Sequence, residues 1–470
     1  MKHGIIISYV FIITTISIIA ISNSGCAVIV PPQGGFRDTI PPVMTKATPA
    51  DSSVNFKGNR INFSFDEYVK IDNFEQNAII SPLPKNMPRP TNRLNTVTLH
   101  IRDTLEPNTT YTIDFGKSIQ DVNEGNVMKD FTYTFSTGPS LDSLSFRGNV
   151  IVAETGVSDS TLTVMLYKTA DDSAVRNERP RYVTKLDGKG NFVFKHLPAG
   201  TFYLYALEDN SRSYRYIDYT KLFAFSDSPV VVQKNAAPRT LYAFRAGKPK
   251  ETSTAPTGKA GAAERRLKFQ TNLKNGNTQD LLQHFTVDFD RPLKNFDSTK
   301  IQFTRDSSYT PVTGYSWTQD TTKKKITLNY SFAEDTRYHL VFQKDFAADT
   351  LGEQLLRVDT IGFKSMKRSD YGKLTIRIRN LDLTKNPVLE FVQNGTVASA
   401  FPLTSENFVQ QLFLPGEYDL RLLYDANKNG VWDPGKFFGV HKQPELVKPI
   451  QRKVIVKEGN DTDIEITAPH

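Results

Sequence analysis

The stretch Leu105–Asn126, LEPNTTYTIDFGKSIQDVNEGN, recurs later in the chain as Phe332–Glu353, FAEDTRYHLVFQKDFAADTLGE. The two stretches align without a gap and share residues at matching positions, such as Tyr111 and Tyr338. In both, apolar and polar residues alternate, which is typical of β-strands with one buried face. The alignment predicts one β domain that is used twice.

Further matches extend the repeat in both directions. Upstream, Ile61–Lys70 matches Phe285–Lys294, and downstream, Asn191–Asn210 matches Asn407–Ala426 with a one-residue gap. The chain is rich in strand-forming residues, with 31 Phe and 19 Tyr. We therefore expect an all-β fold of four tandem antiparallel β-sandwich domains in an A-B-A-B order. Domains of about 100 residues can build such cores without disulfides.

The repeats and the composition predict the boundaries of these parts. A signal peptide is expected at 1–25, a Pro- and Gly-containing tether at 26–37 and a polar, flexible linker at 246–266. The four domains are expected at 38–139, 143–245, 267–366 (diverged) and 370–468. They are called the first to fourth domains below.

The N-terminus combines a basic start at Lys2, a long apolar run and the small-residue exit SNSGC. This combination is typical of a secretory signal segment, with an uncleaved membrane anchor as the alternative. Cys26, at the end of this exit, is the one cysteine of 470 residues. A protein exported to an oxidising compartment uses paired cysteines or none, so a lone thiol here favours a lipid site over an inert buried cysteine.

Ser24, Gly25 and Cys26 resemble the lipobox of bacterial lipoproteins. The resemblance implies cleavage before Cys26 by signal peptidase II and lipid on its sulfur and amine, which would anchor the protein to a membrane. Asn23 departs from the pattern, which usually has an aliphatic residue there. Neither an Asp nor an acidic cluster follows Cys26. By resemblance, this favours the periplasmic side of the outer membrane over the cell surface.

The segments DTIPPVMTKATPADSSVNFKGNRINFSFDEYVK, LEPNTTYTIDFGKSIQDVNEGN and YTFSTG resemble the SbsA-type bacterial Ig-like domain, clearly over 38–139 and weakly over 267–366. The second and fourth domains resemble transthyretin-like sandwiches of the carboxypeptidase-regulatory or Cna-B kind, through the pattern that begins at Gly190 and passes Leu197–Gly200. The whole layout resembles Ig-like-domain lipoproteins of Bacteroidetes, a group whose molecular role is generally unassigned.

The charges and motifs argue against nucleic-acid binding and against catalysis. The net charge is +8 and the basic residues are dispersed; the longest run, Lys323–Lys325, predicts a hairpin turn. The sequence has no His pair at metal-ligand spacing and no G-x-S-x-G, H-E-x-x-H or phosphate-loop motif. Asp66 and Glu67 are adjacent, so on a strand they point to opposite faces and cannot form a glycosidase pair. We expect no enzyme and no cofactor other than calcium.

One stretch, DANKNGVWDPG, has the pattern of a calcium loop. Asp425, Asn427, Asn429 and Asp433 supply side-chain oxygens at positions 1, 3, 5 and 9, with Gly at position 6. Position 12 is Lys436, where an EF-hand has a bidentate Glu. The stretch predicts either a weak calcium site or an Asx-rich hairpin turn.

Aromatic residues offer a possible ligand platform. Tyr214, Tyr216 and Tyr219 alternate near a loop, and the two tryptophans are Trp317 and Trp432. Such residues either form a glycan-binding platform or pack in cores and cross-strand pairs. Trp432, inside the Asp/Asn turn, is expected to pack beneath it.

Three functions remain open. The favoured one is a lipid-anchored, non-enzymatic envelope protein that acts as a structural or interaction/adhesion module for an unknown envelope protein or glycan. The second is a glycan-binding accessory lipoprotein of an outer-membrane importer, and the third is an envelope enzyme with a carboxylate pair between domains. Nucleic acid is not an expected partner.

Overall fold

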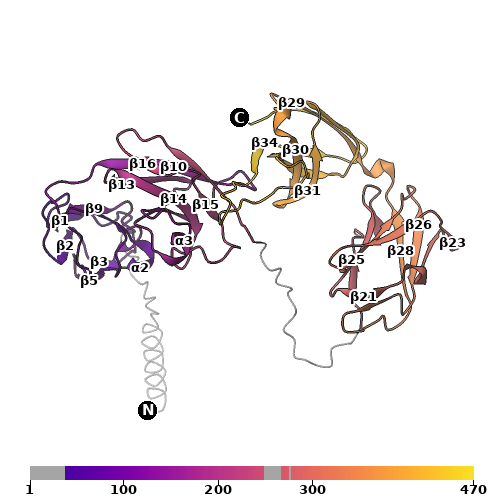
Figure 1. The fold of residues 1–470 in the computed structure, drawn as a ribbon, viewed down its shortest axis with the longest axis horizontal. Coiled ribbons are helices and arrows are strands. Elements are labelled where there is room, and N and C mark those ends of the chain that lie inside the picture. Colours follow the sequence, from indigo (N-terminus) through magenta and orange to yellow (C-terminus); the bar gives the residue numbers. More distant parts are fainter. Residues whose placement is uncertain (1–36, 248–265, 275–276, 470) are drawn as a thin grey trace, which may run out of the picture. The chain divides into compact units, whose positions relative to one another are not determined.

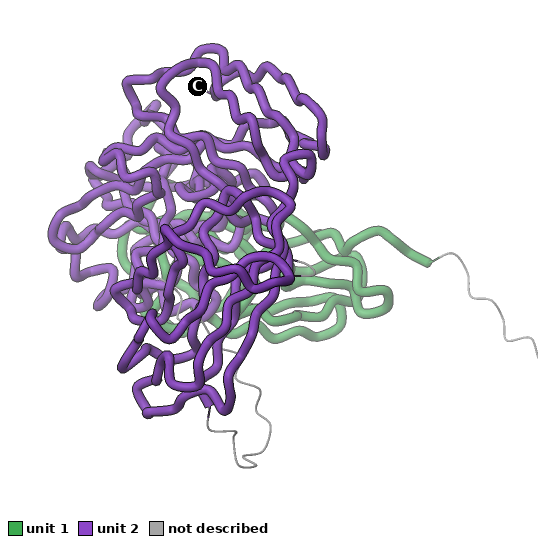
Figure 2. Tube along the Cα trace, turned by 90° about the vertical axis from the view of Figure 1, so that its right-hand side faces the viewer, with its two compact units in different colours: residues 1–141 green, residues 142–470 purple. Residues whose placement is uncertain are grey.

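The computed structural model describes residues 37–247, 266–274 and 277–469. These residues form mainly strands joined by loops (Figure 1), which confirms the all-β prediction. The short helices are α2 (Phe74–Asn77), α3 (Ala174–Asn177), η1 (Ser298–Lys300), η2 (Arg368–Asp370) and η3 (Leu383–Lys385). The chain divides into two compact units, residues 1–141 and 142–470 (Figure 2). The predicted signal peptide, the tether with Cys26 and most of the linker lie outside the described residues.

The first unit is a sandwich of a four-stranded sheet and smaller antiparallel sheets. The larger sheet has the order β1-β2-β6-β5, and the smaller ones are β4-β7-β9 and the pair β3-β8. The strands are β1 (Met44–Thr48), β2 (Arg60–Phe65), β3 (Val69–Ile71), β4 (Ile79–Ser81), β5 (Arg89–Arg93), β6 (Thr96–His100), β7 (Thr110–Asp114), β8 (Ile119–Asp121) and β9 (Thr132–Ser136). In β2 the alternating residues Ile61, Phe63 and Phe65 all point into the core, as period-two alternation predicts.

The second domain packs a three-stranded sheet, β13-β10-β17, against β12-β11-β14-β15, with β16 also paired to β14. Its strands are β10 (Leu144–Val152), β11 (Leu162–Tyr167), β12 (Tyr182–Lys185), β13 (Asn191–Leu197), β14 (Gly200–Glu208), β15 (Phe223–Phe225), β16 (Val230–Val232) and β17 (Arg239–Ala243). A continuous apolar core fills the space between the two sheets.

The third domain contains the sheets β18-β20-β25-β24 and β19-β28-β26-β22-β23 and the pair β21-β27. Its strands are β18 (Phe269–Thr271), β19 (Thr278–Gln279), β20 (Phe285–Phe289), β21 (Leu293–Phe296), β22 (Ile301–Arg305), β23 (Thr310–Pro311), β24 (Ser316–Gln319), β25 (Lys325–Asn329), β26 (Arg337–Phe342), β27 (Ala347–Asp349) and β28 (Asp359–Ser365). The basic run at 323–325 lies at the turn between β24 and β25, as predicted for a hairpin. Trp317 packs against the core of this domain.

The fourth domain repeats the plan of the second. Its sheets are β32-β29-β35 and β31-β30-β33-β34. Its strands are β29 (Gly372–Arg379), β30 (Pro387–Gln393), β31 (Thr396–Pro402), β32 (Asn407–Phe413), β33 (Gly416–Tyr424), β34 (Leu446–Val456) and β35 (Asp461–Thr467). Its core is a separate apolar cluster.

The sheets are not wholly antiparallel, which refines the expected sandwich. In both the second and the fourth domain the first strand pairs in parallel with the last, as β10 with β17 and β29 with β35. The short pair β19 and β28 is also parallel. Because the same parallel pairing occurs in both copies, it belongs to the repeated unit itself. Within the described residues, no helix has the length and apolar character needed to cross a membrane.

Candidate functional site

The Asp/Asn loop predicted to bind calcium follows β33 directly. Asp425 is buried, with 1% of its surface exposed. Its Oδ1 accepts a hydrogen bond from the Asn429 N–H at 3.3 Å, and its Oδ2 accepts one from the Gly430 N–H at 2.6 Å. A buried carboxylate is stable only where such donors compensate for lost water. Asp425 therefore closes the turn that the Asp, Asn and Gly residues favour.

Asp433 draws the rest of the loop together. Its Oδ2 accepts hydrogen bonds from the side-chain amides of Asn427 at 2.5 Å and Asn429 at 2.9 Å. The amide oxygens of these two asparagines accept backbone N–H groups of the loop, at 3.1 and 2.8 Å. The structure thus brings together all four predicted residues.

Glu445 is a member of this site that the sequence did not reveal. Its carboxylate accepts hydrogen bonds from the N–H of Ala426 at 2.8 Å and from the N–H of Asp433 at 3.0 Å, and it is 6% exposed. The sequence carries no sign of this contact, because an irregular segment separates Glu445 from the loop and no motif has a fixed spacing of this kind. Trp432 donates its indole N–H to the Glu445 carbonyl at 2.8 Å and packs against a small buried cluster, as expected for a residue beneath the turn.

These contacts favour the Asx-rich turn, because the loop oxygens already accept hydrogen bonds from the protein. In the described parts of the chain, no three His, Cys, Asp or Glu side chains are grouped so as to hold a metal ion. Calcium binding through Asp425, Asn427, Asn429 and Asp433 stays a prediction. Lys436, at the position of the missing Glu, is exposed.

Residues 434–445, which we call the arm, carry the chain from this loop to β34. The arm contacts the second domain. Phe437 is 3% exposed, and its ring lies 5.6 Å from that of Tyr205 and 5.1 Å from those of Phe223 and Phe225. Aromatic pairs at these separations contribute about 0.5–1.5 kcal/mol each beyond the area that they bury. Phe437 is therefore the main apolar anchor of the arm.

The arm overturns the interpretation of the tyrosines as an exposed platform. Tyr214 and Tyr216 are buried, at 5% and 2% exposed, and Tyr219 is 38% exposed. Phe438 of the arm lies 6.1 Å from Tyr216, and the Arg176 guanidinium lies 3.7 Å from the centre of the Phe438 ring. Tyr216 and Tyr219 lie against Phe438 of the arm and Tyr214 is buried, which agrees with the packing alternative rather than with a free glycan-binding surface.

Polar contacts fix the outer part of the arm. His441 Nε2 lies 2.8 Å from both carboxylate oxygens of Asp172, and its ring stacks on Phe437 at 5.0 Å. Gln443 donates to the Phe225 carbonyl at 3.1 Å and to Asp227 at 2.7 Å. The partially exposed contacts add specificity more than stability, since surface ion pairs contribute about 0–1 kcal/mol.

The backbone completes the junction between the second and fourth domains. The Val447 N–H donates to the Ala153 carbonyl at 2.9 Å. Gly156 lies so close to Val447 and Pro449 that a Cβ atom there would be 2.3 Å from the Pro449 Cδ. The two domains, separated in sequence by the linker and the third domain, are therefore in direct, close-packed contact.

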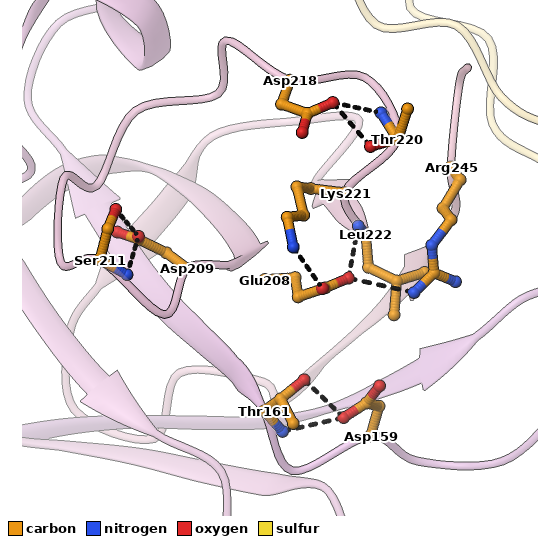
Figure 3. Close-up of polar contacts among 10 residues, drawn as sticks. All are labelled: Asp159, Thr161, Glu208, Asp209, Ser211, Asp218, Thr220, Lys221, Leu222 and Arg245. Carbon is orange, nitrogen blue, oxygen red and sulfur yellow. Dashed lines mark hydrogen bonds and ion pairs between the residues drawn. The ribbon is translucent and has the colours of Figure 1, made fainter. Parts of the chain in front are cut away.

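Glu208, at the end of β14, anchors the loop that lies beneath the arm (Figure 3). It accepts hydrogen bonds from Lys221 and Arg245, both at 3.0 Å, and from the Leu222 N–H at 3.2 Å. Burial by itself would raise the pKa of Glu208, but these donors and the two positive charges lower the pKa below its usual value. Nearby, Asp209 and Asp218 each accept hydrogen bonds from the backbone N–H and the side-chain hydroxyl of the residue two positions later. These bonds shape the same loop.

Asp66 has a structural role. Its Oδ1 accepts a hydrogen bond from the Val43 N–H at 2.8 Å, and its own N–H donates to the Val43 carbonyl at 3.1 Å. These bonds fix the first strand of the first unit. Glu67, its neighbour, lies among other carboxylates, as described below.

Comparisons with known proteins agree with the fold of the first unit. The family described as a bacterial Ig-like domain matches residues 38–137. No curated protein sequence matches the chain.

Solved structures also match the chain, but at low similarity. They include the major pilin subunit BcpA of Bacillus cereus, with 10% identity, a TM-score of 0.17 and coverage of 69% of this chain and 100% of the pilin. The Bacillus anthracis TIE protein has 11% identity, a TM-score of 0.17 and coverage of 93% and 75%. The N-terminal part of the bacterial S-layer protein SbsC has 16% identity, a TM-score of 0.16 and coverage of 43% and 44%. At these TM-scores we take neither domain arrangement nor function from them.

Proposed function

We propose that this chain is a lipid-anchored, non-enzymatic protein of the bacterial cell envelope, of the Bacteroidetes lipoprotein type, whose tandem β-sandwiches act as a structural or interaction module. The anchor is lipid on Cys26, and the periplasmic side of the outer membrane is its place. The observation that carries the proposal is the single cysteine of the chain at the exit of the predicted signal segment. The bacterial Ig-like match at 38–137 supports a module of the envelope.

The arm supports a structural role. It packs the fourth domain against the second through buried aromatic rings, which restricts the motion of one domain relative to the other. A rigid scaffold suits a spacer or a binding platform, because little conformational entropy is lost when a partner binds. The loop at the start of the arm, Asp425 to Asp433, is held by its own hydrogen bonds, which supports a structural role for it.

The anchor is tested by the intact mass of the protein extracted from membranes. The expected mass is that of residues 26–470 plus acyl chains, and the Cys26→Ala variant loses both the acyl mass and the cleavage before residue 26. Asn23→Leu, which restores the usual lipobox residue, is the matched control and is expected to keep the lipidated mass. An unlipidated mass in the wild type, with Cys26→Ala exported and cut in the same way, would contradict the proposal.

A further inference from the structure

One end of the first unit gathers several loops around the point where the described chain begins. We call residues 37–43, 66–70, 93–95 and 121–126 the entry end. The loops are joined by backbone hydrogen bonds. Asp66 N–H donates to the Val43 carbonyl at 3.1 Å, Val69 N–H to the Leu94 carbonyl at 3.1 Å and Val122 N–H to the Tyr68 carbonyl at 3.0 Å. Residues far apart in the sequence therefore share one surface.

This surface exposes apolar side chains. The exposed large apolar residues in the described part of the first unit are Ile40 (66%), Val43 (53%), Val54 (42%), Tyr68 (57%), Leu94 (59%) and Val122 (48%). All of them except Val54 belong to the entry end. Single exposed apolar residues need no explanation, but a group of them on one surface marks a contact site for a partner.

The same end has a net negative charge, since it contains the carboxylates of Asp38, Asp66, Glu67, Asp121 and Glu124 against the cations of Arg37, Lys70 and Arg93. Burial and then the negative charges of Asp121, Asp66, Asp38 and Glu124 raise the pKa of Glu67. Asp121 is fully buried and accepts hydrogen bonds from the N–H groups of Glu124, Gly125 and Asn126 at 2.6, 3.0 and 2.6 Å. Among the described residues, neither Glu67 nor Asp121 has a cationic side chain as an ion-pair partner.

The third domain shows how the same fold neutralises this position. There, Asp349 pairs with Leu293 as Asp121 pairs with Val69. Asp349 likewise accepts N–H groups of the turn that follows it, from Leu351 at 2.9 Å and Glu353 at 3.0 Å. Its carboxylate also accepts a hydrogen bond from Arg291 at 3.2 Å. Arg291 occupies the sequence position of Glu67 in the repeat, so a cation is present in one copy and an anion in the other.

In the other copy the turn after Asp349 also exposes an apolar residue, Leu351 (67%), but two other positions carry lysine. In the first unit the carbonyl groups of Val43 and Leu94 each accept a backbone hydrogen bond. In the third domain the carbonyl groups of Lys268 and Lys323 accept the equivalent bonds. Both lysines are exposed. The fold therefore does not require apolar residues at these positions, and their presence in the first unit needs a different explanation.

We propose that the entry end of the first unit docks a protein partner that presents an arginine or lysine flanked by apolar side chains. The partner's cation takes the place beside Asp121 and Glu67 that Arg291 takes beside Asp349, and its apolar side chains cover Tyr68, Leu94 and Val122. The inference rests on the proposed interaction role, whose partner it names by chemistry, and does not depend on the lipid.

Charge and composition favour a protein over other occupants. Anionic lipid headgroups and nucleic acids are repelled by a surface of this sign. Arginine, tyrosine and tryptophan are enriched among the residues that dominate protein–protein binding. Opposite charges across the contact also select the partner and exclude like-charged surfaces.

The test is site-specific photo-cross-linking in cells with the full-length chain. A photoreactive amino acid replaces Tyr68 in one strain and Val54, the exposed apolar residue outside the entry end, in a control strain. The expected result is a protein adduct at position 68 and none at 54, with an Arg or Lys in the cross-linked segment of the partner. Glu67→Arg is expected to reduce the adduct about tenfold or more, the effect of losing a charge contact in an interface.

Two further variants make the outcome decisive. Glu67→Arg is expected to fold, because Arg291 stands at that position in the third domain, and an unchanged melting temperature checks this. Glu458→Arg, which makes the same charge change at an exposed site of the fourth domain, is expected to leave the adduct intact. The proposal is overturned by no adduct at 68, by an adduct with lipid or with a second copy of this chain, or by an adduct that persists in Glu67→Arg. If the protein has the lipidated mass but gives no adduct, the docking proposal fails while the lipid anchor stands.

Discussion

His441 Nε2 lies 2.8 Å from the carboxylate oxygens of Asp172, a residue 269 positions earlier in the chain. The contact joins the arm of the fourth domain to the second domain, across the linker and the third domain. Phe437 is buried directly beside it, with its ring parallel to that of His441. The arm therefore combines an apolar anchor with a polar contact that fixes its position.

Phe437→Ala is expected to release the arm. Replacing a buried Phe by Ala costs about 3–5 kcal/mol, through lost transfer energy and the cavity that remains. Trypsin is expected to cut the arm after Lys436 and Lys442 faster in this variant than in the wild type. Val440→Ala is the control, since Val440 is 66% exposed on the same arm, and its cutting rate should match that of the wild type. Equal rates for both variants would show that Phe437 does not hold the arm.

Gly156→Ala is expected to strain the junction between the second and fourth domains. Its φ is +71°, and a Cβ atom would lie 2.6 Å from the Val447 carbonyl oxygen and 2.3 Å from the Pro449 Cδ. Gly395→Ala is the control, with φ +80° but no atom within 4 Å of the new Cβ. In both variants the left-handed backbone conformation lowers the free energy of unfolding by about 1 kcal/mol. In Gly156→Ala the clash should lower it by about 1–3 kcal/mol more. Thermal melts measure the difference, which would vanish if the two domains were not packed here.

Glu390 is expected to make the fourth domain less stable as the pH rises. Burial raises the pKa of Glu390 from 4.5 to about 7, while Arg421 lowers it and Glu154 raises it. An acid with a raised pKa in the folded state takes up a proton on folding. Stability is therefore highest below pH 4.5 or so and falls as the pH rises through 7, by about 3 kcal/mol for this one group.

Glu390→Gln is the corresponding variant. A neutral amide of the same shape should remove most of this slope and make the fourth domain more stable than the wild type at pH 8. Urea unfolding at pH 5 and pH 8 measures both effects. Parallel pH slopes for wild type and variant would show that Glu390 does not remain buried and protonated.

Calcium binding by the Asp/Asn loop has its own test. Sites of this extracellular kind have dissociation constants of about 10⁻⁴–10⁻³ M. At 10 mM, calcium would then stabilise the fourth domain by about 1.4–2.7 kcal/mol. The measurement is the melting temperature with calcium and with EDTA, and Asp433→Ala should abolish the difference. Magnesium at the same concentration is the control. Equal melting temperatures in calcium and EDTA would leave the hydrogen-bonded turn as the whole role of the loop.

The sequence predicted the sandwiches well because strand alternation is local. TYTIDF, for example, gives β7 from residue order alone. The repeat was correct in kind but not in every position. A gapless alignment pairs Asp121 with Ala348, whereas the structure puts Asp349 in the place of Asp121. Compared with the first unit, the third domain has one residue more before Asp349 and one residue fewer in the turn after it. These two differences cancel, so the sequence alignment shows no gap.

The arm could not be predicted by the same means. Phe437 and Phe438 lie in an irregular stretch, and the side chains that they contact are more than 200 positions earlier. One signal was available. In β11, LTVMLY, and in β14 the apolar residues run on without alternation, which indicates a strand covered on both faces. The sequence therefore indicated that something covers this sheet, but not which segment does so.

The docked arm also determines how the chain would bear tension. Because the second and fourth domains touch directly, a pull between Asp142 and Pro469 is carried through the arm and through the Val447–Ala153 hydrogen bond. The third domain, which lies between these two domains in the sequence, is then outside this path and bears little of the load. Only when the arm is pulled free would the third domain come under load, and the protein would lengthen in that step.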